Sequence, residues 1–299
     1  MLPWLFFCFN LVKVYVKYIT DLGKAVRKTL GVSFIVCALT ACGGGGGDSY
    51  TSVGGGVKNP DTNSESIGKY NGTGGGKGPV VNSEAMGIYR GTTIQEQTAV
   101  GLVDKNNKIW FLYTPPYTNM VNGFIAGNLI ISGNKVTSTN GKDYHLESSS
   151  IYNTIINGTV ETKKSLTGTI TYQPSNQVTF NTVYDAALNN TKADLATIAG
   201  AYIGQSAIVQ GVENANLTIN NTGVIAGKGQ SGCVFSGKAT AEINASYYTI
   251  SLVFSGSPCY MAGQEVNGVA YFDPTNKSIY AIAENSSRQN AVLFLGTKQ

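Results

Sequence analysis

The chain contains one histidine, His145, and this residue is the first candidate for chemistry. It lies in the sequence GKDYHLESS, with Asp143 two residues before it and Glu147 two residues after it. Alternate residues of a β-strand point to the same face, so on a strand these three side chains would lie together. A histidine between carboxylates suits proton transfer, which gives the hypothesis of a hydrolase. No Gly-x-Ser-x-Gly nucleophile motif occurs, however, and an exposed polar strand face explains the same residues.

The cysteines give a second candidate site. Of five cysteines, Cys8, Cys37 and Cys42 precede or begin a glycine-rich segment, which leaves Cys233 and Cys259 in the remaining chain. Two thiols without a nearby histidine are too few ligands for a metal site. In an exported protein such a pair is expected to form a disulfide, which would stabilise its domain by about 3 kcal/mol.

Tyrosines are the third candidate group. Tyr113 and Tyr117 flank two prolines in FLYTPPYTN, and Tyr247 is followed directly by Tyr248, so that one of this pair would point outward when the other points inward. Exposed tyrosines are useful for binding proteins and glycans. The sequence therefore offers these four side chains as possible binding residues for a protein or glycan partner.

After Ser83 the sequence alternates apolar and polar residues in short runs separated by turn residues. The stretch TAVGLVDKNNKIWFLYT predicts a hairpin, and similar strands recur about every eight to twelve residues. This spacing predicts an all-β fold with two consecutive antiparallel β-sandwich or barrel domains, residues 85–190 and 191–299. One larger barrel is the alternative. The one helix expected is short, within residues 189–200, and would end at Gly200.

Two pairs of similar stretches within the sequence favour a chain with two similar halves. The stretch GIYRG at residues 87–91 resembles GAYIG at residues 200–204, and VDKNNKIWFLY resembles FDPTNKSIYAI. Asp104 and Asp273 begin the turns of the second pair. A calcium loop with its terminal Glu is absent, so turn formation is the better interpretation of both residues.

The N-terminal region has the pattern of an export signal. Residues 24–42 read KAVRKTLGVSFIVCALTAC, a basic segment followed by an apolar run too short to span a bilayer. The ending LTAC resembles the lipobox of bacterial lipoproteins, which implies that residues 1–41 are a removed leader and that Cys42 is lipidated. An earlier apolar stretch precedes this signal, so we expect initiation near Leu22 or Val26 rather than at Met1. The resemblance also implies the outer membrane, because Gly43 stands where an Asp would mark inner-membrane retention.

Residues 42–84 are rich in Gly, Ser and Asn and contain few apolar side chains, which predicts a flexible, disordered tether. The leader carries five basic residues and one acid out of 21 and 17 in the whole chain, which leaves 16 of each from Cys42 onward. A nucleic-acid-binding domain would carry a basic face, so this balance excludes that class.

The sequence predicts a membrane-anchored envelope lipoprotein of the outer membrane, acting as a non-enzymatic module that binds a protein, glycan or envelope component. No cofactor or metal is expected. The second domain resembles the small barrels of transferrin-binding-type surface lipoproteins, because it opens on a Gly-x-Tyr-x-Gly strand and closes on VLFLGTKQ; no ligand is carried over from this resemblance. The alternatives are an envelope hydrolase that uses His145 with acidic partners and an immunity or inhibitor lipoprotein.

Overall fold

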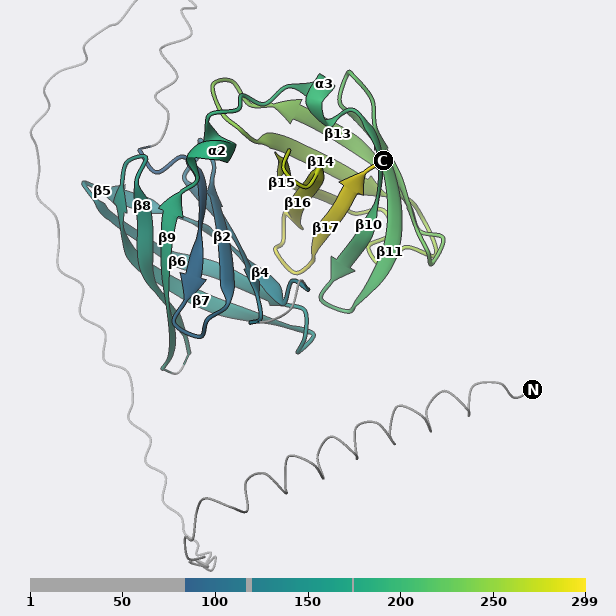
Figure 1. Ribbon diagram of the computed structural model, residues 1–299. Coiled ribbons are helices and arrows are strands. Elements are labelled where there is room, and N and C mark those ends of the chain that lie inside the picture. The colour runs from purple at the N-terminus through teal and green to yellow at the C-terminus, as the bar shows by residue number, and fades with distance from the viewer. Residues whose placement is uncertain (1–83, 117–119, 174) are drawn as a thin grey trace, which may run out of the picture. The chain divides into compact units, whose positions relative to one another are not determined.

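The computed structural model describes residues 84–116, 120–173 and 175–299, which form two consecutive antiparallel β-barrels (Figure 1). This confirms the all-β prediction, and the chain forms two barrels rather than one larger one. The leader, the tether and Cys42 lie outside the described residues. No helix within the described ranges is long and apolar enough to cross a membrane.

The first barrel runs in chain order and closes between β4 and β6, with the short β5 pairing along the beginning of β6. Its strands are β1 (Gly87–Thr93), β2 (Thr98–Val103), β3 (Lys108–Thr114), β4 (Gly123–Asn128), β5 (Ile130–Ser132), β6 (Lys135–His145), β7 (Ser150–Glu161), β8 (Ser165–Tyr172) and β9 (Asn176–Tyr184).

The second barrel closes between its first and last strands, β10 and β17. Its strands are β10 (Gly200–Ile208), β11 (Gly211–Ile219), β12 (Val224–Gly229), β13 (Val234–Ala241), β14 (Tyr248–Phe254), β15 (Glu265–Asp273), β16 (Ser278–Asn285) and β17 (Ala291–Lys298).

Two four-residue helices, α2 (Ala186–Asn189) and α3 (Leu195–Ile198), connect the barrels. The expected helix over residues 189–200 is thus reduced to α3. It begins after Asp194, whose side chain accepts a hydrogen bond from the backbone N–H of Ala196 and so caps the helix.

The two barrels open with the same local geometry. Tyr89 in β1 and Tyr202 in β10 each donate a hydrogen bond to the backbone carbonyl four residues earlier, at 2.8 Å in both barrels. Gly91 and Gly204 lie against the last strand of their barrels, so closely that a Cβ atom would overlap a backbone carbonyl oxygen there. The repeated Gly-x-Tyr-x-Gly motif therefore marks equivalent positions in the two barrels. At its second glycine, pairing of the first strand with the last strand requires a residue without a side chain.

The similarity between the two hairpin sequences, VDKNNKIWFLY and FDPTNKSIYAI, has a different origin. Asp104 begins the turn between β2 and β3, whereas Asp273 begins the turn between β15 and β16, so the two turns are not at equivalent places in the barrels. In both, the carboxylate accepts a hydrogen bond from the backbone N–H two residues later, which is the turn-forming role expected from the sequence.

Both faces of β3 are buried, which explains its unbroken apolar run. Phe111 belongs to the apolar core inside the first barrel, while Trp110 and Leu112 point outward. These outward side chains share an apolar cluster with outward residues of the second barrel, among them Val269 and Leu293. The two barrels are thus joined by apolar packing, and each also has its own interior core.

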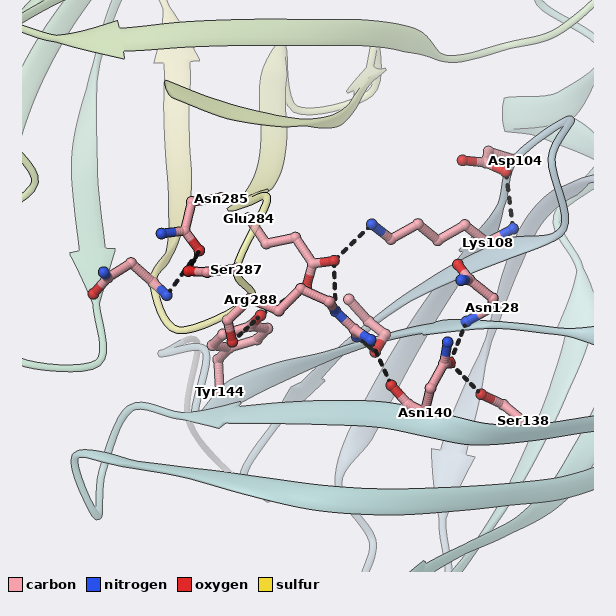
Figure 2. Close-up of polar contacts among 12 residues, drawn as sticks. Asp104, Lys108, Asn128, Ser138, Asn140, Tyr144, Glu284, Asn285, Ser287 and Arg288 are labelled. Carbon is pink, nitrogen blue, oxygen red and sulfur yellow. Dashed lines mark hydrogen bonds and ion pairs between the residues drawn. The ribbon is translucent and has the colours of Figure 1, made fainter. Parts of the chain in front are cut away.

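A buried acid from the second barrel, Glu284, organises the polar part of this junction (Figure 2). Its carboxylate forms ion pairs with Lys108 of β3 at 2.7 Å and with Arg288 at 2.9 Å. It also accepts a hydrogen bond from the Tyr144 hydroxyl at 2.7 Å. One carboxylate therefore links two strands of the first barrel to the second barrel.

Arg288 extends the junction to an irregular part of β6. The pairing between β6 and β7 shifts register between Ser138 and Gly141. Within this irregularity the backbone carbonyl of Asn140 accepts a hydrogen bond from Arg288 at 2.6 Å (Figure 2). The backbone carbonyl of Ala126 in β4 accepts a second hydrogen bond from Arg288 at 2.6 Å. The irregularity therefore presents a backbone acceptor to the second barrel.

Cys233 and Cys259 form the disulfide expected from the sequence. The bond closes 26 residues that include β13 and β14, and both cysteines are buried at one end of the second barrel.

Candidate functional site

A pocket of about 380 Å³ opens at one end of the first barrel, where the β1–β2, β6–β7 and β8–β9 turns lie. We call it the first-barrel pocket. Its apolar floor continues the barrel core and its rim carries side-chain amides. The floor residues are Phe111, Ile125, Ile170 and Val178, and the rim residues are Gln95, Gln97, Gln173 and Asn176.

Asp143 is the buried acid of this end of the barrel. It lies on β6 with no exposed surface, and its carboxylate accepts two tyrosine hydroxyls. Tyr113 of β3 donates to Oδ1 at 2.7 Å, and Tyr172 of β8 donates to Oδ2 at 2.9 Å. Both tyrosines also line the pocket, so the carboxylate lies directly behind the pocket wall.

Gly123 allows Tyr113 to reach Asp143. It lies between Tyr113 and His145 in the row formed by β3, β4 and β6. A Cβ atom on Gly123 would overlap the Tyr113 hydroxyl and ring. The absence of a side chain at this position therefore lets the tyrosine cross the neighbouring strand toward the carboxylate.

Four rings form a continuous side of the pocket, which we call the aromatic wall: Tyr113, His145, Tyr152 and Tyr172. Neighbouring ring centroids lie 6.0, 6.1 and 6.3 Å apart along this row. The pairing of β6 with β7 sets Asp143 opposite Tyr152, and the pairing of β7 with β8 sets Thr154 opposite Tyr172. Strand register thus brings residues distant in sequence to one wall.

The His145 ring is oriented by its own turn. Its Nδ1 accepts the backbone N–H of Ser148 at 3.2 Å and lies 3.1 Å from the Ser148 hydroxyl, which in turn lies 3.3 Å from the Tyr152 hydroxyl. A ring that accepts at Nδ1 carries its proton on Nε2 when neutral, which leaves Nε2–H as a donor.

The environment of Asp143 disfavours its charge. Burial raises the pKa of this carboxyl from 3.8 to about 6, although the hydroxyls of Tyr113 and Tyr172 and the nearby His145 act in the opposite direction. Burial, followed by the negative charge of Asp143, raises the pKa of both bonded tyrosines. The hydroxyls therefore remain donors to the carboxylate at neutral pH.

This shift predicts how replacing Asp143 changes the pH dependence of stability. The folded-state pKa of Asp143 lies above the usual value of a carboxyl group. The favourable contribution of this group to the free energy of unfolding is therefore fully present below about pH 4 and is lost as pH rises through 6. Asp143→Asn removes this loss, so the free energy of unfolding of the variant, measured relative to the native protein, should rise by about 2 kcal/mol between about pH 4 and pH 7. Urea unfolding of both proteins at several pH values measures the difference. A difference that stays constant with pH would contradict the assignment.

The predicted hydrolase arrangement is only partly present. Asp143 and His145 do point to the same end of the barrel interior, but β6 ends at His145, and Glu147 lies exposed in the following turn. The expectation that all three share a strand face is therefore wrong for Glu147. Asp143 gives its oxygens to tyrosines, and within the described ranges no carboxylate hydrogen-bonds to His145. A nucleophile–base–acid triad is not formed there.

The exposed-tyrosine predictions also need correction. Tyr247 and Tyr248 do point to opposite faces, but both are buried. Tyr248 lies inside the second barrel, while Tyr247 points outward and is covered by the first barrel, where its hydroxyl accepts the backbone N–H of Lys105. Tyr113 is 5% exposed and serves the pocket wall rather than an open surface. Tyr117 lies outside the described residues.

The sequence pattern predicts neither Tyr152 nor Tyr172 as a site residue, and it indicates Asp143 only as an acidic partner of His145. One signal was present, namely an acid two residues before the histidine on an alternating strand. No local signal connects Tyr172 to that strand, because its contact with Asp143 spans 29 residues of sequence.

Other cavities fit a ligand site less well. The second barrel holds an apolar cavity of about 30 Å³, which is room for little more than a water molecule. A larger groove of about 690 Å³ lies between β1, β10 and β15–β17. Arg90 in this groove already pairs with Asp185 and Asp273, so its charge is compensated. The first-barrel pocket differs because no lysine or arginine among the described residues pairs with its buried carboxylate, which has only His145 as a basic neighbour there.

Fold and site together define a double β-barrel protein with a polar pocket in the first barrel. No protein-family model matches the chain, and no curated protein matches it. Among solved structures, a putative outer membrane protein of Bacteroides fragilis is 12% identical, with 72% of this chain and 98% of that chain covered, at a TM-score of 0.26.

Transferrin binding protein B of Neisseria meningitidis is 10% identical, with 68% of this chain and 66% of that chain covered, at a TM-score of 0.27. The protein of the same name from Haemophilus parasuis is 10% identical, with 71% and 66% covered, at a TM-score of 0.26. Scores this low carry no argument about function, so the site itself must provide it.

Proposed function

We propose that this protein is a lipid-anchored lipoprotein of the outer membrane that binds a small ligand, or the terminal group of a larger envelope component, in the first-barrel pocket. It acts by binding and not by catalysis. The observation that carries this proposal is the pocket of about 380 Å³ in which apolar floor, aromatic wall and amide rim converge above buried Asp143. Concave sites of this size with a few placed polar groups are typical of ligand binding.

The unfavourable free energy of burying the Asp143 charge supports a functional role for this residue. A buried carboxylate whose pKa is raised destabilises the folded protein at neutral pH. Binding sites commonly keep such unfavourable groups because they serve the ligand rather than the fold.

The test is retention of compounds from an envelope extract by the full chain, with mass spectrometry of what is bound. Asn176→Trp places a large ring on the pocket rim and should abolish retention, because it narrows the opening. Asn157→Trp, at an exposed position of β7 outside the pocket lining, is the matched control and should retain the same compounds. Equal retention by both variants would place binding elsewhere and contradict the proposal.

The lipid anchor rests on the lipobox-like LTAC sequence and is tested separately. Cys42→Ser should abolish incorporation of a radiolabelled fatty acid and move the protein from the membrane fraction to the soluble fraction. Cys37→Ser, within the expected leader, should leave both unchanged. Fatty-acid labelling of Cys42→Ser at the native level would refute lipidation of this residue.

A further inference from the structure

We propose that the first-barrel pocket recognises an ammonium group on a small ligand. This deepens the proposed function and rests on it. The inference comes from three features of the wall: a buried carboxylate that forms no ion pair with a described residue, hydroxyls oriented by that carboxylate, and aromatic rings arranged beside them.

Among the described residues, Asp143 forms no ion pair, and the nearby His145 is the basic side chain that favours its charge. Of the buried acids in the described part of the chain, Glu284 pairs with lysine and arginine side chains and Asp273 pairs with Arg90. Asp104 accepts backbone N–H groups of its turn. Asp143 instead accepts hydrogen bonds from two tyrosine hydroxyls and has His145 nearby without an ion pair. A cationic ligand would supply the missing charge at short range, where the low local dielectric strengthens the attraction.

The hydroxyls carry this negative potential to the pocket. Tyr113 and Tyr172 each direct their single hydroxyl hydrogen toward Asp143, so their oxygens keep only lone pairs for the pocket. They can accept hydrogen bonds from a ligand N–H but have no hydrogen to donate to a ligand anion. Among the described residues that line the pocket, His145 is the basic side chain and there is no lysine or arginine, so no permanent positive charge is placed there to attract an anion.

The rings add an attraction specific to cations. Aromatic faces attract ammonium groups, and most strongly where water is excluded. Tyr152 stands between His145 and Tyr172 in the aromatic wall, with edge-to-face contacts on both sides, and is 42% exposed. An ammonium group beside this wall would contact rings and tyrosine oxygens together. A neutral polyol could use the amide rim, but it would add no positive charge near Asp143.

The experiment is calorimetric titration of the full chain, in a detergent without an ammonium headgroup. The probes are choline and ethanolamine, each compared with 3,3-dimethylbutanol, in which carbon replaces the charged nitrogen of choline. At least one of the two cations should bind roughly tenfold more tightly than the neutral isostere. An isostere that binds as tightly as both cations, or no binding of either cation, would overturn the inference.

Two variants connect the effect to the wall. Asp143→Asn removes the buried negative charge and should weaken cation binding by at least about tenfold while leaving binding of the isostere unchanged. Tyr152→Ala should weaken it about twofold to fivefold, because one ring is lost. Tyr260→Ala removes an exposed tyrosine of the second barrel and should have no effect. Native cation affinity in Asp143→Asn would also overturn the inference.

The ammonium inference can be wrong while the proposed binding function is right, and the retention experiment separates the two outcomes. If the pocket retains a neutral or anionic compound that Asn176→Trp does not retain, the pocket is a binding site and only the ammonium inference is wrong.

Discussion

Glu284→Gln should lower the free energy of unfolding by about 3 kcal/mol, the largest effect we expect from a single substitution. The change keeps the size of a side chain that is 4% exposed but removes the one negative charge shared by Lys108 and Arg288. These two cations would then face each other at a buried junction without compensation. They are 23% and 22% exposed, so the cost falls at the lower end of the range for fully buried pairs.

Urea unfolding followed by circular dichroism measures this loss. Because Glu284 joins the two barrels, the variant should also begin to unfold in two separable steps. The matched control is Glu161→Gln, which removes an exposed pair with Lys164 and should change stability by less than about 1 kcal/mol. Equal small effects of the two substitutions would show that the junction does not depend on this carboxylate.

Removal of the disulfide is the second large effect. The double variant Cys233→Ala/Cys259→Ala should lose about 3 kcal/mol, because the unfolded chain gains the freedom of a 26-residue loop. Hydrogen exchange should accelerate in β13 and β14, which lie within that loop, more than in the first barrel.

The control for this prediction is chemical reduction. Dithiothreitol should destabilise the native protein by a similar amount and should not affect the double variant. A native protein that keeps its unfolding midpoint after complete reduction would contradict the predicted contribution.

Local sequence predicted the hairpins well, because turn chemistry is local. Asn107 adopts positive φ in the turn that the sequence marks with Asp and Asn. The β2–β3 hairpin follows from these residues and from the strand alternation around them. The opening Gly-x-Tyr-x-Gly strands likewise mark equivalent positions in the two barrels.

The site could not be predicted in the same way. Alternation shows that Asp143 and His145 share a face, but it does not show that this face lines a pocket or which strands lie beside it. Tyr113 reaches Asp143 across 30 residues of sequence, through a path that depends on barrel closure at β4–β6. Tyr247 shows the same limit, since alternation places it outward but cannot reveal that the first barrel covers it.

The most direct test of the central claim, that the first-barrel pocket is a ligand-binding site, uses the single histidine of the chain. In protein labelled at histidine and purified without a histidine tag, one imidazole signal reports from the aromatic wall. Adding the compounds retained from the envelope extract should shift the His145 signal saturably in the native protein and not in Asn176→Trp. A compound that binds the native protein while the His145 signal stays unchanged would contradict the claim.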